Sequence, residues 1–205
     1  MSNLQASKED NIVKIVNIVF WKQLVIGIFF GLLNFGLETL SNPIKNLTSL
    51  FFDTIGIVAA SFFGWVSGIV SVIVEHACVM IFWNGDWIGR LFALCSFTVV
   101  VVIQLFYRKR EKITFISVVI VYLILMLLIS LEGAILSTFI YNKFNLPDNA
   151  NLRYLTSFFM KQQLPMIFSA FLARIPTNLA DKAICTFAGW GLFELAKKLH
   201  PAMRG

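Results

Sequence analysis

The fold of this chain is decided by residues 47–83, which read LTSLFFDTIGIVAASFFGWVSGIVSVIVEHACVMIFW. These 37 residues are mostly apolar, but Asp53, Glu75 and several glycines interrupt them. An apolar helix of about 20 residues is long enough to cross a bilayer. The stretch therefore predicts either one span with apolar flanks or a tight hairpin of two short helices that turns near Phe62–Ser67.

Positive charge elsewhere in the chain decides between these two interpretations. The basic run RKREK at residues 108–112 and the lysines Lys8, Lys14 and Lys22 before the first apolar segment are expected on the cytoplasmic side, under the positive-inside rule. With a cytoplasmic N-terminus, three spans before the basic run would leave it outside, whereas four spans place it inside. We therefore expect the hairpin.

The composition indicates a membrane protein rather than a soluble one. Of the 205 residues, 58% are hydrophobic and only 14% are charged, whereas a soluble domain carries about 25% charged residues. We expect an all-α, polytopic helical bundle that forms one membrane domain over residues 1–205, multi-pass in the inner (cytoplasmic) membrane of a cell. The net charge of +6 then falls in the cytoplasmic half, where it orients the protein and contacts anionic lipid of the bilayer. We expect no nucleic acid partner.

The apolar segments predict about six transmembrane helices, with both termini in the cytoplasm. The expected segments are 12–40 with an interfacial N-terminal extension, the hairpin 47–83, 88–107, 113–139, 155–173 and a last span 177–198. Segment 155–173 contains several polar residues and Pro165, so we expect it to lie along the outer surface as a lid or to dip into the membrane. If it crossed the membrane completely, the C-terminus would move outside and the charge rule would be broken.

Charged residues within these apolar segments are the main indication of function. Each costs roughly 2.5–3.5 kcal/mol to insert at the centre of a membrane helix, so such residues usually line a cavity or pair with one another. In the six-span arrangement they all fall in the outer half, which predicts one polar pocket open to the exterior. The candidate substrate-binding residues are Asp53, Glu75, His76, Trp83, Asn84, Asp86, Arg90, Glu132, Arg174, Asn178, Asp181 and Lys182.

Three of these candidates lie close together at the start of the expected last span. Pro176 is suited to begin a helix, because the first turn does not need its missing N–H. Asn178 comes three and four residues before Asp181 and Lys182, so the three side chains share one helix face. They form either a cap and a salt bridge at the interface, or donors and acceptors for a ligand with Arg174 at the rim.

Metal-dependent and catalytic functions find little support in the residue pattern. His76 is accompanied by only one other histidine, His200, and a zinc site needs more nitrogen or sulfur ligands. The three cysteines lie singly in apolar surroundings, without a C-x-x-C pair. No nucleophile–base pair is visible either. We therefore expect no metal, no cofactor and no enzymatic activity.

Small residues in the first span suggest a surface for a partner. Gly27 and Gly31 are spaced four residues apart, as in the small-x-x-x-small pattern that lets membrane helices approach closely. We expect this face to dock against another protein.

Two stretches of the chain resemble a known family. The first runs from Phe52-Asp-Thr-Ile-Gly56 into Ala59-Ala60 and then Gly64-Trp-Val-Ser-Gly68, and the second from Leu172-Ala-Arg-Ile-Pro176 through Asp181-Lys182. Both are similar to stretches of the substrate-binding (S) components of energy-coupling factor transporters. The resemblance implies a six-helix protein that captures a vitamin or similar micronutrient on the outside. It also implies partners, namely a transmembrane scaffold subunit and cytoplasmic ATPases.

The sequence thus favours a membrane-embedded substrate-capture subunit of an ATP-driven importer, which binds a vitamin-like small molecule in an outward-facing pocket. No motif for thiamine, riboflavin, biotin or folate binding is recognisable, so the substrate does not follow from the resemblance. The alternative is a ligand-sensing membrane module or an assembly factor that acts through protein partners.

Overall fold

The computed structural model describes residues 19–41, 50–83, 88–107, 113–144 and 150–199. Within these ranges every regular element is a helix, which confirms the all-α class. The helices are an N-terminal helix Val19–Ser41, α2 (Ile55–Ser61), α3 (Trp65–Phe82), the 3₁₀ turn η1 (Gly89–Phe92), α4 (Ala93–Tyr107), α5 (Phe115–Phe144), α6 (Ala150–Lys161) and α7 (Met166–Leu199).

Four of the described helices are long and apolar enough to cross a membrane, judged by length and composition. They are Val19–Ser41, Trp65–Phe82, Gly89–Tyr107 and Phe115–Lys143. Large apolar side chains cover their outer faces, among them Phe29, Leu105 and Ile116, which are all exposed. Such a surface suits lipid rather than water. The prediction of a helical membrane bundle is therefore confirmed, although four helices rather than six meet this criterion.

The hairpin turns where the sequence predicted. After α2 the chain turns at residues 62–64, and α3 follows at once. Gly64 has a φ of 145°, a conformation that a side chain disfavours. However, α2 has only seven residues, all of them buried, and is about 10 Å long, so it cannot cross a bilayer by itself. It is an internal helix, in keeping with a sequence that is apolar on every side.

The predicted segments 155–173 and 177–198 do not exist as separate units. α6 ends at Lys161, and α7 then runs without a break from Met166 to Leu199, with Pro176 inside it. The expectation that Pro176 begins the last helix was therefore wrong. Proline usually breaks soluble helices because it lacks an N–H, but membrane helices tolerate it where nearby groups satisfy the freed carbonyl. The resulting helix is about 51 Å long, which exceeds the hydrocarbon core of a bilayer.

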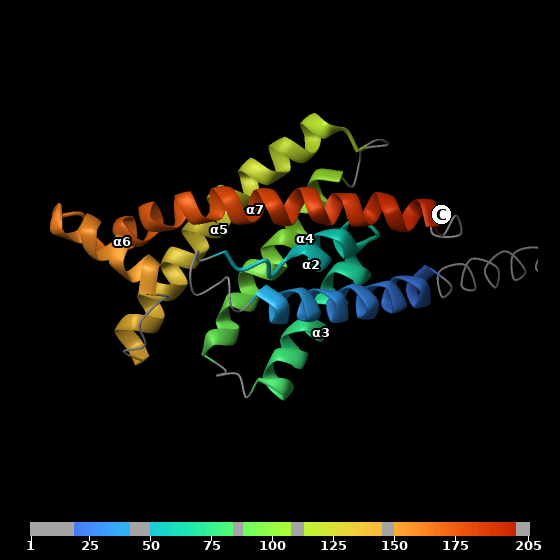
Figure 1. Ribbon diagram of the computed structural model, residues 1–205, viewed down its shortest axis with the longest axis horizontal. Helices are drawn as coiled ribbons and strands as arrows, with labels where there is room; N and C mark the ends of the chain where they lie inside the picture. Colours follow the sequence, from blue (N-terminus) through green and yellow to red (C-terminus); the bar gives the residue numbers. More distant parts are fainter. Residues whose placement is uncertain (1–18, 42–49, 84–87, 108–112, 145–149, 200–205) are drawn as a thin grey trace, which may run out of the picture.

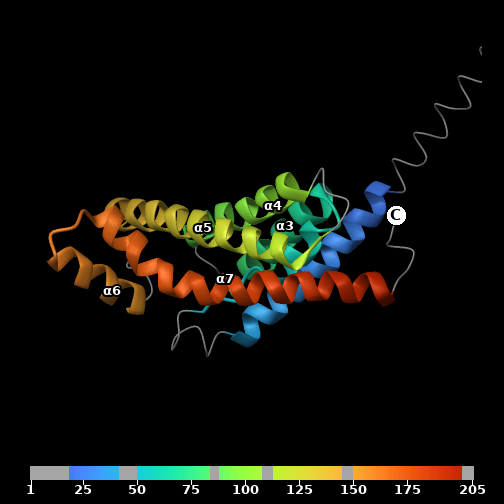
Figure 2. The same cartoon turned by 90° about the horizontal axis from the view of Figure 1, so that it is seen from above.

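The helices form an elongated bundle in which α7 follows the long axis (Figure 1). The C-terminal end of α7 and the start of the N-terminal helix lie at the same end of the molecule, while α6 lies at the opposite end (Figures 1 and 2). Buried aliphatic residues of α2, α3, α4 and α5 form the main core, which includes Ile57, Val72 and Leu125. Gly189 of α7 lets that helix pack closely on α2, since a Cβ there would lie 2.6 Å from Val58.

The glycine face of the N-terminal helix is occupied within the chain itself. A Cβ on Gly27 would lie 2.7 Å from the Ser67 carbonyl oxygen, and one on Gly31 would lie 2.8 Å from that of Ser71. Both glycines therefore allow close packing against α3. The prediction that they dock a partner was wrong, because the pattern signals close approach but does not say which helix approaches.

Candidate substrate-binding cavity

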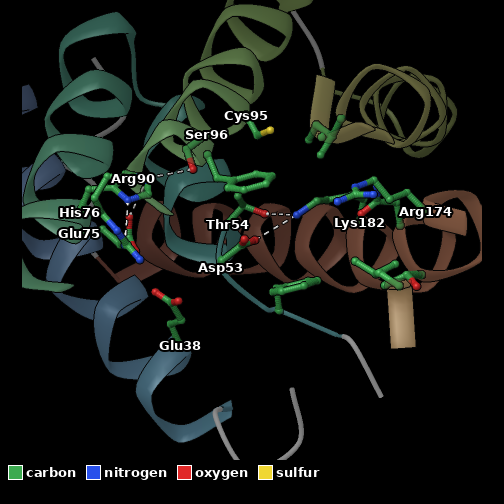
Figure 3. Close-up of a pocket in the computed structure, with 17 residues that line it drawn as sticks. Glu38, Asp53, Thr54, Glu75, His76, Arg90, Cys95, Ser96, Arg174 and Lys182 are labelled. Carbon is green, nitrogen blue, oxygen red and sulfur yellow. Dashed lines mark hydrogen bonds and ion pairs between the residues drawn. The ribbon is translucent and has the colours of Figure 1, made fainter. Parts of the chain in front are cut away.

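A cavity of about 270 Å³ lies among the helices. It is lined by side chains of the N-terminal helix, the segment before α2, and most of the remaining helices (Figure 3). The lining residues are Glu38, Phe51, Asp53, Thr54, Glu75, His76, Arg90, Phe92, Cys95, Ser96, Ile129, Gly133, Leu152, Arg174, Thr177, Asn178 and Lys182. Widely separated parts of the chain thus meet at one polar site.

Most of the predicted site residues that the structure describes are brought together here. Those that line the cavity are Asp53, Glu75, His76, Arg90, Arg174, Asn178 and Lys182. Asp181 and Glu132 do not line it, and Trp83 packs instead on Phe35, with ring centroids 5.6 Å apart. Asn84 and Asp86 lie outside the described residues.

At one end of the cavity, His76 is held between three polar groups (Figure 3). Its Nδ1 lies 3.4 Å from Arg90 Nη1, and its Nε2 lies 3.3 Å from Ser96 Oγ and 3.2 Å from Glu75 Oε2. A guanidinium only donates, so Nδ1 is the acceptor and the imidazole proton sits on Nε2. In this arrangement the ring is neutral and its N–H faces Ser96 and Glu75.

Near the middle of the cavity, the ammonium of Lys182 is surrounded by oxygen atoms. Nζ lies 3.0 Å from Asp53 Oδ1, 2.8 Å from Asp181 Oδ2 and 3.4 Å from Thr54 Oγ1. Asp53 and Thr54 accept hydrogen bonds from the ammonium, and the contact with Asp181 is an ion pair. Lys182 is therefore neutralised inside the protein and is not available to neutralise an anionic ligand.

Asp181 anchors the segment that precedes α2. It is fully buried, and its Oδ1 accepts hydrogen bonds from the backbone N–H groups of Phe51 (2.8 Å) and Phe52 (3.0 Å). Phe52 has a φ of 51°, which is costly for a residue with a side chain. The salt-bridge interpretation of Asp181 is thus confirmed, but it lies in the middle of α7 rather than at a helix start.

Asn34 fixes the other side of the same segment. From the N-terminal helix, its side chain donates to the Asp53 carbonyl oxygen (2.6 Å) and accepts from Gly56 N–H (2.8 Å). Asn34 is completely buried, so both bonds form away from water and are correspondingly strong. Together with Asp181 it sets the position of Asp53 in the cavity.

The third part of the lining comes from α5 and α7. Asn178 Nδ2 donates to Ser130 Oγ (2.9 Å), and Arg174 Nη1 donates to the Ala170 carbonyl oxygen (3.3 Å). The Arg174 side chain passes over Gly133, where a Cβ would lie 3.0 Å from its Nε. Gly133 therefore makes room for the guanidinium beside the cavity.

Several lining residues were not predicted as site residues. Glu38 is an acidic residue near the end of an apolar span. The signal that identified the other charged site residues therefore applies to Glu38 as well. Ser96, Thr54 and Thr177 are small polar residues without any motif, and the sequence carries no sign of their role.

One group of side chains has the composition of a metal site but does not fit one. Ligand atoms of Asp53, Asp181 and Cys185 all lie within 4.8 Å of one another. However, the Lys182 ammonium contacts both carboxylates at 3.0 and 2.8 Å, so a positive charge already fills the position that a cation would take. We assign no metal to this group.

Comparison with known proteins gives no further guide to the site. No protein-family model, curated protein or solved structure matches this chain.

Proposed function

We propose that this chain is a membrane-embedded binding protein that captures a small, polar, vitamin-like molecule, as the substrate-capture subunit of an ATP-driven importer. The observation that carries the proposal is the charged cavity inside an otherwise apolar helical bundle. Buried charge is costly in such a setting, and a concave site with a few convergent polar groups is what ligand-binding sites have in common.

The size of the cavity suits a small organic molecule. An engineered cavity of about 150 Å³ in another protein holds benzene, so about 270 Å³ offers room for roughly two rings or one substituted ring. The lining combines aromatic faces, such as Phe51 and Phe92, with hydrogen-bonding and charged groups. A vitamin-like molecule with a ring and polar substituents matches both features.

The six-span topology with cytoplasmic termini belongs to the same proposal, with the short buried helix α2 counted as an incomplete second crossing. The start of the N-terminal helix and the end of α7 lie on one side of the bundle (Figures 1 and 2), and Lys22, Lys197 and Lys198 lie near these helix ends. If this end faces the cytoplasm across the inner (cytoplasmic) membrane, these lysines lie on the inner side, as the positive-inside rule requires. The cavity then lies towards the exterior. Of its lining residues, Glu38 is near the far end of the N-terminal helix, and Arg90 is in the turn just before α4 runs back towards the cytoplasm.

Ligand binding by the purified protein tests the proposal. In lipid nanodiscs, one compound from a panel of soluble vitamins and nucleobases should raise the unfolding midpoint. At a hundredfold excess over Kd, binding stabilises by about 2.7 kcal/mol, which corresponds to a shift of about 5–10 °C for a chain of this size. The protein alone should hydrolyse no ATP. If no compound in a broad panel raised the unfolding midpoint, the proposal would be contradicted.

Co-purification from the native membrane tests the importer assignment separately. A transmembrane scaffold and cytoplasmic ATPases should accompany the chain. Recovery of a kinase in their place would support the alternative of a ligand-sensing module and would contradict import.

A further inference from the structure

A second cavity, of about 260 Å³, lies where α5, α6 and α7 meet near one end of the bundle (Figure 2). Its lining residues are Ser137 and Tyr141 of α5, Arg153, Thr156, Ser157 and Met160 of α6, and Met166 and Ala170 of α7. Within each helix these positions are separated by the three or four residues that place neighbours on one face. Three helix faces therefore enclose the cavity, and it shares no lining residue with the first one.

The polar groups of this lining are of the kind that binds phosphate. They are one guanidinium, from Arg153, and four hydroxyls, from Ser137, Tyr141, Thr156 and Ser157. None of the described lining residues is acidic. Arginine and hydroxyl side chains are common partners of phosphate oxygens, and a guanidinium can bind two such oxygens at once. A phosphate group therefore complements this cavity in both charge and hydrogen bonding.

Most of these donors are available for a ligand. The Ser137 hydroxyl donates to the Ala134 carbonyl oxygen at 3.2 Å. Within the part of the chain that the structure describes, Arg153, Thr156 and Ser157 take part in no hydrogen bond or ion pair. A ligand can therefore bind these donors without breaking a contact within the described protein.

The cavity lies at the depth of lipid headgroups. The candidate span Phe115–Lys143 of α5 has 29 residues and is about 43 Å long, whereas the hydrocarbon core of a bilayer is about 30 Å thick. The last turns of this span therefore reach the headgroup level, and Ser137 and Tyr141 belong to them. Tyrosine is enriched at this level of a membrane.

α6 combines the features of a helix that lies in the membrane interface. It is amphipathic, and it exposes Tyr154 and Phe158 as well as the basic residues Arg153 and Lys161. Phe168, near the start of α7, is exposed too. Helices with exposed aromatic residues and a basic face bind at the boundary between headgroups and acyl chains, and they bind anionic lipid more strongly.

The orientation of the protein does not explain the positive charge of this region. Residues 137–170 contain three basic residues and one acidic residue, a net charge of +2. In the proposed topology α6 is at the exterior end, whereas the positive-inside rule accounts for basic residues on the cytoplasmic side. Attraction to anionic lipid gives this charge a different role.

We propose that the cavity between α5, α6 and α7 binds the phosphate of an anionic phospholipid. Arg153 and the hydroxyls of Tyr141, Thr156 and Ser157 hold the phosphate, and the acyl chains lie against the exposed apolar residues of α6 and α7. The bound lipid fixes α6 at the membrane surface. This site is separate from the proposed capture of a substrate, so either can fail without the other.

Native mass spectrometry of the full chain tests the inference. Protein released from nanodiscs with equal amounts of phosphatidylglycerol (anionic) and phosphatidylcholine (zwitterionic) should retain one phosphatidylglycerol, with a preference of about fivefold, the effect of one basic side chain near an anionic surface. Arg153→Gln should lose this preference. Lys161→Gln makes the same change on the same helix, outside the lining, and should keep it. Ser137→Phe fills the cavity without changing its charge and should lose it.

Equal retention of the two lipids by the unaltered chain would overturn the inference. Equal losses in Arg153→Gln and Lys161→Gln would also overturn it, because they would indicate diffuse surface charge rather than a site. Both side chains are exposed, so this comparison decides the question even if Ser137→Phe does not fold. A folded Ser137→Phe variant that keeps the preference would place the lipid elsewhere.

A soluble phosphate ester distinguishes a lipid from a free ligand. Glycerol 3-phosphate at millimolar concentration should leave phosphatidylglycerol bound, because it lacks the acyl chains that contact the exposed apolar residues. Complete displacement of the lipid by this compound would identify a soluble phosphate ester as the occupant and would overturn the inference.

Discussion

Replacing Asp181 with asparagine should destabilise the protein by about 3 kcal/mol, although the two side chains have nearly the same shape. Asp181 is fully buried and accepts two backbone N–H groups, at 2.8 and 3.0 Å, while its second oxygen lies 2.8 Å from Lys182 Nζ. Hydrogen bonds to a charged group contribute about 1.5–3 kcal/mol each, and neutral ones about 1 kcal/mol. Asparagine also turns an NH₂ group or a weaker acceptor towards the ammonium.

The expected loss stays at the lower limit of the 3–5 kcal/mol that breaking a buried ion pair costs. The reason is that Lys182 keeps its contact with Asp53, whose side chain is 36% exposed and so remains partly solvated. For a chain of this size the unfolding midpoint should fall by about 6–12 °C. Tryptophan fluorescence in nanodiscs would record the midpoint, and hydrogen exchange should increase in residues 50–54, which Asp181 holds in place.

Two further variants make this test specific. Glu194→Gln removes an ion pair with Lys197 in which both side chains are about a third exposed (37% and 33%), and such surface pairs contribute little, so the midpoint should move by less than about 2 °C. Adding Lys182→Met to Asp181→Asn should restore part of the stability, because no uncompensated ammonium is left. An Asp181→Asn midpoint within the range of Glu194→Gln would refute the assignment of Asp181 as a buried anchor.

Two other outcomes follow from the packing and the proposed topology. Gly31→Leu should destabilise the protein strongly because the side chain would collide with α3, whereas Gly36→Leu on the same helix should be tolerated because nothing lies within 4 Å of the new Cβ; similar thermal midpoints for the two variants would contradict this packing. Single cysteines introduced at Lys161 and Lys198 should react with a membrane-impermeant maleimide from opposite sides of the membrane, and labelling of both from the same side would overturn the six-span topology.

The apolar runs predicted the simplest parts of the fold. Expected segments 88–107 and 113–139 correspond to helices Gly89–Tyr107 and Phe115–Lys143, because long stretches without charge leave few alternatives to a membrane helix. The continuous α7 was missed because Pro176 is a helix breaker in most contexts, and the sequence does not show which neighbours satisfy the freed carbonyl.

The sequence predicted which residues lie at the site better than it predicted what each of them does there. Charged residues inside apolar segments, where charge is energetically costly, include residues that do line the cavity, such as Glu75 and Arg90. The same principle cannot tell a residue that faces the cavity from one that pairs behind it. Asp181 was one of the predicted ligand-binding residues, and the structure places it behind the lining against the backbone of residues 51 and 52. Pairing of this kind depends on contacts between residues about 130 positions apart.

Binding to a variant with a filled cavity tests the central claim most directly. Ser96 lines the cavity and is buried, so Ser96→Phe would occupy space that a ligand needs. Isothermal titration of the best compound from the vitamin panel should give one site per chain in the native protein and at least a tenfold weaker Kd in Ser96→Phe. The matched control is Ser137→Phe, at the second cavity between α5, α6 and α7, which should leave the Kd unchanged. Equal Kd values in the native protein and in Ser96→Phe would show that the ligand binds elsewhere and would contradict the account.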